Sequence, residues 1–410
     1  MYKLFLFFTV VCLGIIITGC SSTRRTYNRE NKFEKEEGTL IRVLLNEQEG
    51  KYDWHVESSV YLSDSDNELT LIHPGNSLSV SNSRDEININ VGGKNFRGRE
   101  FYLAAAEEDS SLNYNGSSYK GTLKIIPDGS EIRVLNVLSL EQYLKGVVPY
   151  EMPSSNRKEY YEALKAFTIC ARTYTISKLN ENKNTFDVYS DTRDQVYGGC
   201  GRENEALNKI VEDTRGLILT YNGKPAITLY HSTCGGYTED AANVFTKINA
   251  PYLRGIKDGE EPYCSISPKF TWTENFDEQD FIRRFVSAGY LDNQDYTFQS
   301  ATINSLFRSG RINELQLNFS DRNNNLKTVK LYGNNIRYVI RTADNKSILE
   351  SNNFNIKANG DRYIVIKGKG YGHGVGLCQW GALAQSKQGK TYEEILSFYY
   401  PGTKIESFND

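Results

Sequence analysis

Glu151 lies in a short segment whose composition suits a general acid. Residues 147–153 read VVPYEMP, so valines, a methionine and two prolines surround a single carboxyl group. Apolar surroundings raise the pKa of a carboxyl group and can keep it protonated near neutral pH. Because proline restricts the backbone and lacks an N–H group, we expect the preceding helix to end at Pro149 and Glu151 to lie on a rigid loop. Glu151 is therefore the candidate catalytic residue.

Two other stretches combine a histidine with glycines. Residues 231–236 read HSTCGG and residues 372–376 read GHGVG. Glycines at such spacing let a backbone pass close to another segment or a ligand. His231 and Cys234 could begin a zinc site, but no second compact pair of Cys and His residues accompanies them, so we expect no metal. Cys234 or Cys378 beside a histidine could act as a nucleophile, although the sequence alone pairs no base with either. Neither glycine-rich nucleotide motif occurs, and we expect no cofactor.

The elements that must position these residues indicate an α+β fold. Up to residue 138, short apolar runs alternate with turn residues, which is typical of a β-rich region. Ser139 and Gln142 match a capping box for a short helix, and apolar residues recur at helical spacing from Tyr160 to Tyr174, so we expect that helix to bury one face. Asn222 and Gly223 predict a type I′ hairpin. Further helices are expected near 204–214 and 278–288, and strands at 314–319, 327–332 and 363–366.

These elements predict four parts in the folded chain. Residues 39–138 form the β-rich part, and residues 139–264 form a central core that contains the helices and the catalytic residue. Residues 265–360 are expected to be an inserted α+β subdomain. Residues 361–407 return to the core as a glycine-rich C-terminal segment.

The N-terminus predicts export. The apolar run from Leu4 to Ile17 is shorter than the ~20 residues needed to span a bilayer, so residues 1–19 are typical of a signal peptide. The run ends in small residues followed by Cys20, which resembles a bacterial lipobox, and we expect Cys20 to be lipidated. A plain signal peptide or a buried N-terminal strand is the alternative. Residues 20–38 are highly charged and predict a flexible tether. The expected location is that of an exported, membrane-anchored bacterial lipoprotein facing the cell wall or periplasm.

The folded part contains an odd number of cysteines. They are Cys170, Cys200, Cys234, Cys264 and Cys378, so at least one stays free. We expect a disulfide between Cys234 and Cys264, which would contribute about 3 to 4 kcal/mol by closing a loop of about thirty residues. Cys170, on the buried face of the long helix, is expected to be a free thiol.

Composition excludes one class of partner. The chain has 48 basic and 51 acidic residues among 410 and a formal charge of −3, so it lacks the summed positive field that attracts nucleic acid. Its 39% hydrophobic and 24% charged residues are those of a folded protein rather than a disordered one.

Six collinear blocks together resemble one protein family. They are residues 147–153 (VVPYEMP), 162–174 (EALKA and ARTY), 195–198 (QVYG), 231–239 (HSTCGGYTE), 372–382 (GHGVG and QWGA) and 395–403 (IL and YYPGT). In this order they resemble the SpoIID family, which comprises stage II sporulation protein D and the amidase enhancers (LytB). The blocks extend over nearly all of the folded chain.

The resemblance implies a peptidoglycan lytic transglycosylase that acts on glycan strands, with Glu151 as its catalytic acid. Some members hold zinc through Cys and His in the segment that matches residues 187–195, where this chain has Tyr189 and Asp194, so metal binding is not carried over. The expected partners are peptidoglycan glycan strands, the membrane through the lipid and a cell-wall amidase.

We expect the glycan to lie in a groove between the Glu151 loop, residues 195–198, residues 231–236 and residues 372–376, because each is a polar or glycine-rich break at the end of an apolar element. The expected substrate-binding residues are Gln195, Tyr197, His231, Ser232, Thr233, His373 and Gln379. Two alternatives remain. One is a non-catalytic glycan-binding enhancer of an amidase, and the other is a hydrolase with a second carboxylate, for which the candidates are Glu162, Asp187, Asp191 and Glu239.

Overall fold

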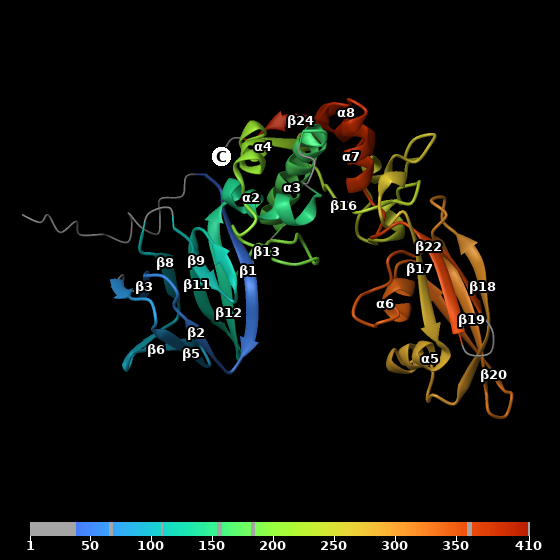
Figure 1. The fold of residues 1–410 in the computed structure, drawn as a ribbon, viewed down its shortest axis with the longest axis horizontal. Helices are drawn as coiled ribbons and strands as arrows, with labels where there is room; N and C mark the ends of the chain where they lie inside the picture. The colour runs from blue at the N-terminus through green and yellow to red at the C-terminus, as the bar shows by residue number, and fades with distance from the viewer. Residues whose placement is uncertain are drawn as a thin grey trace, which may run out of the picture.

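The computed structural model describes residues 38–64, 69–107, 110–153, 158–181, 185–358 and 363–408. The expected signal peptide, the Cys20 lipidation site and nearly all of the expected tether lie outside these residues. Helices and several sheets are mixed along the chain (Figure 1), so the predicted α+β class is confirmed. Of the helices described, none is both long and apolar enough to cross a membrane.

The N-terminal part is rich in strands, as predicted, and it has two larger sheets and the short pair β9-β10. A seven-stranded sheet has the order β13-β1-β12-β11-β8-β3-β4, and a four-stranded sheet has the order β2-β5-β6-β7. Apolar residues of both sheets, such as Val43 and Val80, belong to one hydrophobic core. The strands are β1 (Leu40–Glu49), β2 (Lys51–His55), β3 (Val60–Asp64), β4 (Leu69–Ile72), β5 (Ser77–Ser83), β6 (Glu86–Val91), β7 (Lys94–Gly98), β8 (Phe101–Ala105), β9 (Leu112–Tyr114), β10 (Ser117–Tyr119), β11 (Thr122–Asp128), β12 (Glu131–Ser139) and β13 (Val188–Tyr189).

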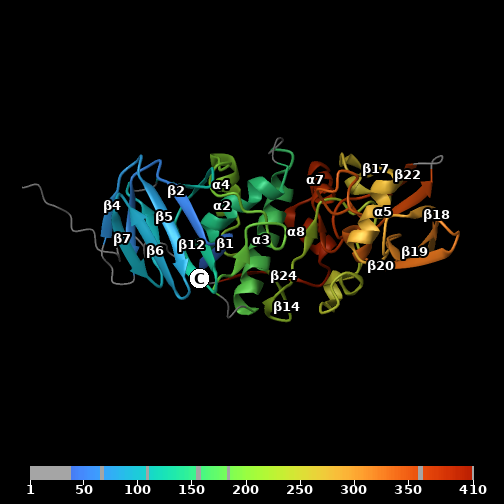
Figure 2. The same cartoon turned by 90° about the horizontal axis from the view of Figure 1, so that it is seen from below.

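The same core continues into a group of helices in the middle of the molecule (Figures 1 and 2). These helices are α2 (Leu140–Glu151), α3 (Tyr161–Glu181), α4 (Glu205–Asp213), α7 (Gln379–Lys387) and α8 (Tyr392–Tyr399). Helix α3 is surrounded by the others, and its residues from Phe167 to Ile176 are all buried. The predicted face is buried, but the burial extends to the other faces of the helix as well. The sequence did not indicate this because Thr168, Thr173 and Thr175 are polar, although their hydroxyl groups donate to carbonyl oxygens one turn earlier.

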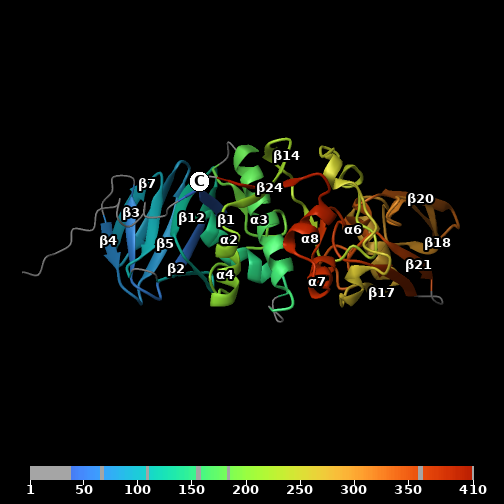
Figure 3. The same cartoon turned by 90° about the horizontal axis from the view of Figure 1, so that it is seen from above.

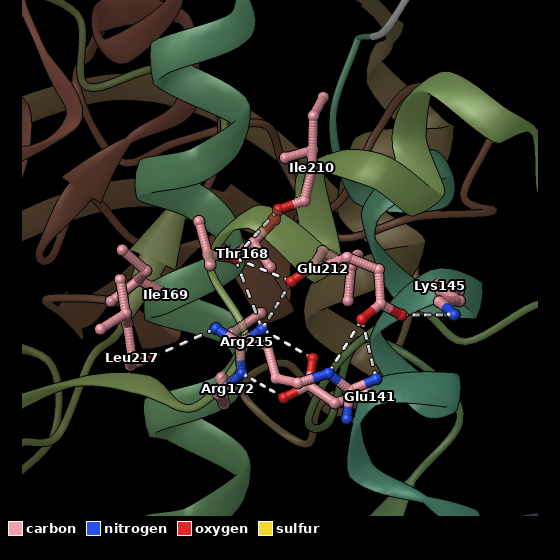
Figure 4. A network of polar contacts seen from close by, with 12 residues as sticks. Glu141, Lys145, Thr168, Ile169, Arg172, Ile210, Glu212, Arg215 and Leu217 are labelled. Carbon is pink, nitrogen blue, oxygen red and sulfur yellow. Dashed lines mark hydrogen bonds and ion pairs between the residues drawn. The ribbon is translucent and has the colours of Figure 1, made fainter. Parts of the chain in front are cut away.

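A buried ion pair joins α3 to α2 (Figure 4). The Arg172 guanidinium donates through Nε and Nη2 to the two carboxylate oxygens of Glu141, each at 2.8 Å. Its remaining protons reach the carbonyl oxygens of Leu217 at 3.2 Å and Val211 at 3.3 Å. Arg172 is fully buried and Glu141 is 4% exposed. A planar guanidinium suits this bidentate geometry, and every partner lies on an element that packs against α3.

Helix α2 does not end where its sequence predicts. It begins after Ser139, as expected, although the Ser139 side chain makes no capping bond, and it runs through Pro149 to Glu151. A proline inside a helix removes one hydrogen bond, at a cost of about 3 kcal/mol. The Met152 N–H donates to the Val148 carbonyl at 3.1 Å and closes the last turn, and the buried side chains of Val147 and Val148 hold this turn in the core. Glu151 is consequently the last residue of a helix rather than part of a loop.

Short strands connect the central helices to the C-terminal segment. Asn222 and Gly223 both have positive φ, so the predicted type I′ hairpin is confirmed. The second strand of this hairpin ends at Pro225. After residues 226–229, which belong to no strand, β16 (Tyr230–His231) pairs in parallel with β23 (Leu377–Cys378). The hairpin strands are β14 (Leu217–Tyr221) and β15 (Lys224–Pro225), and β14 also pairs with β24 (Lys404–Ser407).

A second unit has its own hydrophobic core, which includes Phe281, Phe319 and Ile366. It lies at the end of the molecule opposite the N-terminal sheets (Figures 1 and 3). Strand β22 pairs with β17 and β21, so the expected boundary at residue 360 falls inside a hairpin of this unit. Its elements are β17 (Thr271–Asp277), α5 (Glu278–Ser287), β18 (Tyr296–Leu306), β19 (Ile312–Asp321), β20 (Leu326–Tyr332), α6 (Asn335–Ile340), β21 (Phe354–Ala358) and β22 (Tyr363–Lys369).

Candidate active site

The Glu151 carboxyl group is held by two segments that are distant in the sequence. Its Oε1 accepts a hydrogen bond from the Val196 backbone N–H at 2.7 Å. The Gln379 side-chain amide donates to the Glu151 backbone carbonyl at 3.0 Å and approaches Oε2 at 3.4 Å. Gln379 is the first residue of α7 and is 6% exposed. The carboxyl group therefore has a defined orientation at the meeting point of α2, α7 and the segment after β13.

Opposing effects act on the acidity of Glu151. Burial raises the pKa of its carboxyl group, while the Val196 N–H and the Gln379 amide lower it, and the pKa remains above its ordinary value. The Tyr230 hydroxyl also lowers this pKa, although the two groups do not meet hydrogen-bond geometry. A raised pKa increases the protonated fraction near neutral pH, which a general acid requires.

The raised pKa of Glu151 predicts a specific pH dependence of stability. Because the folded state binds this proton more tightly than the unfolded chain does, the free energy of unfolding should fall as the pH rises from the ordinary to the raised pKa. The loss is about 1.4 kcal/mol for each pH unit by which the pKa is raised. Glu151→Gln cannot ionise, so its stability relative to wild type should increase across this range. Urea unfolding of both proteins at about pH 4 and about pH 8 measures this difference, and a difference that does not grow with pH would contradict the prediction.

Gln195 and Tyr197 lie in the interior beside the Glu151 contact. The Gln195 amide oxygen accepts a hydrogen bond from the Tyr143 hydroxyl at 3.1 Å and lies 2.9 Å from the Thr175 hydroxyl oxygen, and Gln195 has no exposed surface. Tyr197 is 5% exposed and donates to Asn136 at 2.6 Å. These contacts fix the segment whose N–H group binds Glu151. Direct binding of substrate by the two side chains stays a prediction.

Residues 195–198 pack tightly against the end of α2. The Tyr150 hydroxyl donates to the Gly198 carbonyl at 3.0 Å. A Cβ atom at Gly198 would lie 2.1 Å from the Tyr150 ring, and one at Gly146 would lie 2.4 Å from the Tyr197 ring. Only glycine fits at both positions, so the small residues set the distance between the two segments.

His231 and His373 come from different segments and lie side by side, with ring centroids 5.6 Å apart. His231 Nδ1 is 3.0 Å from the Val375 carbonyl, so this nitrogen carries the proton, whereas His373 Nδ1 accepts from the Val375 N–H at 3.0 Å. Burial, aided by the nearby Arg311, lowers the pKa of His231 to about 3. Burial also lowers the pKa of His373. Both rings are therefore neutral near neutral pH. The Nε2 atom of His231 has no hydrogen-bond partner among the described residues.

Ser232 and Thr233 follow His231 in the HSTCGG turn. Thr233 is fully buried, and its hydroxyl lies 2.7 Å from the Ser267 hydroxyl. Ser232 is partly exposed, and its carbonyl accepts from the Trp380 N–H at 3.1 Å. Substrate contacts of these two residues and of His373 stay predictions.

The structure brings the four predicted segments together. Glu151 contacts Val196 and Gln379, as described above. Strand β16 pairs with β23, which directly precedes Gln379. A backbone bridge between Thr233 and Tyr371 ties the HSTCGG turn to the glycine-rich segment. The contacts run continuously from one segment to the next.

The expected disulfide between Cys234 and Cys264 is absent. Both are free and buried, and their sulfur atoms lie 3.3 Å apart, compared with about 2.05 Å in a disulfide. A third cysteine, Cys378, shares the site, and its sulfur accepts from the Cys234 N–H at 3.2 Å. Cys170 is a free buried thiol as predicted, and burial raises its pKa to about 12.

The spacing of residues in the sequence did not reveal one cluster of possible metal ligands. His231 is not part of the cysteine cluster, but Asp258 is, and the three sulfurs and an Asp258 oxygen lie within 4.8 Å of one another. These residues come from three separate segments, which no compact sequence motif can reveal.

The side chains of residues 187–195, the segment for which the resemblance implied zinc ligands in some family members, make other contacts in this chain. Asp187 forms an ion pair with Arg42 at 2.6 Å. Asp194 accepts from the Tyr174 hydroxyl at 2.6 Å and from the Tyr189 N–H at 2.9 Å. The carboxylates of this segment therefore anchor it to β1 and α3.

Tyr230 and Arg311 are site residues that sequence reasoning missed. Tyr230 directly precedes the HSTCGG turn and lies near Glu151. Arg311 is 1% exposed and donates to the carbonyls of Gly372 at 3.1 Å and Cys234 at 3.4 Å. Arg311 belongs to the second unit, where its sequence neighbours give no signal of a role in the central core.

Comparisons with known proteins match the part of the chain that contains this site. The SpoIID family model, described as stage II sporulation protein, matches residues 128–221, which include Glu151 and Val196. The chain is 32% identical to an uncharacterised protein of Brachyspira hyodysenteriae over 374 residues, which cover 90% of this chain and 94% of that protein.

Two relatives from Bacillus subtilis carry functional names. The chain is 33% identical over 294 residues to stage II sporulation protein D, covering 65% of this chain and 74% of that protein. It is 32% identical over 304 residues to an amidase enhancer, again with 65% of this chain but only 40% of the length of that relative. Agreement in the family model, in the relatives and in the segments that meet at Glu151 leads to one conclusion: the chain belongs to the SpoIID family.

Proposed function

We propose that this protein is a peptidoglycan lytic transglycosylase in which Glu151 acts as both general acid and general base. The observation that supports this proposal most directly is a partly buried carboxyl group of raised pKa, oriented by a backbone N–H and an amide from two other segments. An acid that must donate and then recover a proton needs this fixed position.

The proposed reaction uses one carboxyl group in both steps. Protonated Glu151 donates its proton to the glycosidic oxygen, and the bond between this oxygen and C1 of the muramic acid breaks. The resulting carboxylate then takes the proton from the C6 hydroxyl of the muramic acid as that oxygen bonds to C1. The product is a 1,6-anhydro sugar, the carboxyl group is protonated again, and no water is consumed. The Val196 and Gln379 donors stabilise the carboxylate between the two steps.

The other carboxylates considered from sequence have partners away from Glu151. Glu162 accepts from the Tyr392 N–H at 2.8 Å, Asp191 pairs with Arg193 at 2.7 Å, and Glu239 accepts from Asn243 at 2.8 Å. Asp187 pairs with Arg42, as noted above. A hydrolase would need a second carboxylate about 5 to 9.5 Å from the acid. These contacts favour the mechanism with one carboxyl group.

A second function has support from one relative. The amidase enhancer of Bacillus subtilis shares 32% identity with this chain, so we also consider a protein that binds glycan and stimulates a cell-wall amidase. Either function suits an exported lipoprotein anchored through Cys20, which is the location we propose. Because the alignment with the Brachyspira relative covers 90% of this chain, strand cleavage and stimulation of an amidase should also be compared in that protein.

The products of a glycan digest distinguish the functions. Purified protein is incubated with peptidoglycan glycan strands, with and without stem peptides, and the fragments are analysed by mass spectrometry. We expect fragments that end in 1,6-anhydromuramic acid. Reducing ends would instead identify a hydrolase, and intact strands that bind the protein, together with a faster amidase, would identify an enhancer.

A further inference from the structure

Three cysteines and an aspartate meet in the core behind the HSTCGG turn. The sulfurs of Cys234, Cys264 and Cys378 and a carboxylate oxygen of Asp258 all lie within 4.8 Å of one another, and all four residues are buried. Cys234 and Cys264 approach to 3.3 Å. The four residues come from the turn after β16, the loop at residues 258–264 and the start of α7.

Hydrogen-bond donors are directed at the ligand atoms of this cluster. Backbone N–H groups of Cys234 and Gly236 point at the sulfurs of Cys378 and Cys234, at 3.2 and 3.4 Å. The Cys264 N–H donates to Asp258 at 2.9 Å. These donors stabilise ionised sulfur and carboxylate, whereas burial opposes their ionisation. Ionised together at such short range, the four groups would therefore need a cation between them.

We infer that Cys234, Asp258, Cys264 and Cys378 together bind one structural zinc ion. In a tetrahedral site with metal–sulfur distances of about 2.3 Å, the ligand atoms lie about 3.8 Å from one another. The closest pair, at 3.3 Å, would have to separate by about 0.5 Å, and no pair would have to close by more than about 1 Å to accept the ion. Thiolate-rich tetrahedral sites select zinc over magnesium or calcium, which prefer oxygen ligands. Four protein ligands in a buried position leave no place for substrate, so this site is structural.

Outer contacts support the ligands, as is usual for zinc sites. The Tyr399 hydroxyl donates to the other Asp258 oxygen at 2.7 Å and orients the carboxylate. The buried Arg311 guanidinium approaches the Cys234 carbonyl at 3.4 Å and adds a second positive charge. On binding, each thiol releases its proton to solvent, so three thiolates and one carboxylate face the divalent ion and Arg311.

The ion would connect the cluster to the candidate active site. Cys378 directly precedes Gln379, whose amide contacts Glu151. Cys378 also pairs with His231 through strands β23 and β16. A zinc ion bound to Cys378 would therefore fix the start of α7 relative to the HSTCGG turn. A disulfide between two of the three cysteines is the competing state in an oxidising compartment.

Metal analysis of the full chain tests this inference without any measurement of activity. The protein is purified under reducing conditions without a metal-binding tag, dialysed against zinc and then against buffer, and analysed for metal. We expect one zinc ion per chain, and a cobalt-substituted sample should show the visible bands of tetrahedral thiolate coordination. Absence of bound metal, or an intact mass that is two hydrogens lighter because of a disulfide, would overturn the inference.

Variants and a chelator locate the site. Cys264→Ser and Asp258→Asn should lose most of the bound zinc, whereas Cys200→Ser, which changes a partly exposed cysteine outside the cluster, should keep it. A chelator should lower the Tm of the wild type and of Cys200→Ser by several degrees. If the cluster variants do not fold, the chelator experiment on the wild type and Cys200→Ser still decides. A chelator that leaves the Tm of both proteins unchanged would contradict the site.

Discussion

Glu151→Gln is expected to retain glycan binding and to lose nearly all strand cleavage. Glutamine keeps the shape of the side chain and can still accept the Val196 N–H bond, but it has no proton to transfer. General acid–base catalysis typically contributes about 10²- to 10⁴-fold, and one residue serves both steps here, so the rate should fall by the upper end of this range. The measurement is the rate of release of anhydro-ended fragments, with binding to isolated peptidoglycan measured in parallel.

A matched control separates chemistry from structure. Glu162→Gln changes a carboxylate of α3 that accepts the Tyr392 N–H, so it should affect stability more than cleavage. If Glu151→Gln released fragments at a near-normal rate while another carboxylate proved essential, the assignment of Glu151 would be wrong. If neither the wild type nor the variant cleaved strands, yet both bound them and stimulated an amidase, the enhancer function would replace the transglycosylase.

The largest effect on stability is expected at Arg172. Arg172→Met would leave the Glu141 carboxylate buried without its bidentate partner and would free the carbonyls of Leu217 and Val211. Removing one member of a buried ion pair costs about 3 to 5 kcal/mol. Urea unfolding monitored by circular dichroism measures this loss.

Two further proteins make the Arg172 result interpretable. In the double variant with Glu141→Leu, the uncompensated charge is gone, so much of the lost stability should return. The control is Arg193→Met, which breaks an exposed ion pair with Asp191. Its N–O distance of 2.7 Å is close to the 2.8 Å of the buried pair, but its side chains are 55% and 50% exposed. Such an exposed pair contributes about 0 to 1 kcal/mol. Equal losses in Arg172→Met and Arg193→Met would contradict the proposed importance of the buried pair.

The environment of Glu151 could be predicted from its sequence neighbours, but its place at the end of a helix depends on packing. Its sequence neighbours predicted an apolar environment, and burial does raise its pKa. Its two prolines predicted a loop, yet α2 continues through Pro149. The local preference of proline was outweighed because the valines before it are packed in the core.

Arg172 illustrates a signal that the sequence did contain. A charged residue at the centre of an otherwise apolar and threonine-rich helix indicates a buried partner, but the sequence alone does not say which of many carboxylates supplies it. The choice of Glu141 follows from the packing of α2 against α3, in which the two charges face one another.

The sequence by itself determined the elements whose signals are local: the β-rich N-terminal part, the start of helix α2 after Ser139, the Asn222–Gly223 hairpin and the motifs of the SpoIID family. Turn chemistry and hydrophobic periodicity act over a few residues, so they can be read without a structure. Only the tertiary structure decided which residues meet. It joined Val196 and Gln379 to Glu151, and it brought Cys378 and Asp258 to the cysteines that we had paired with each other. These contacts link positions up to 228 residues apart, and they depend on the packing of the whole core, which no local pattern encodes.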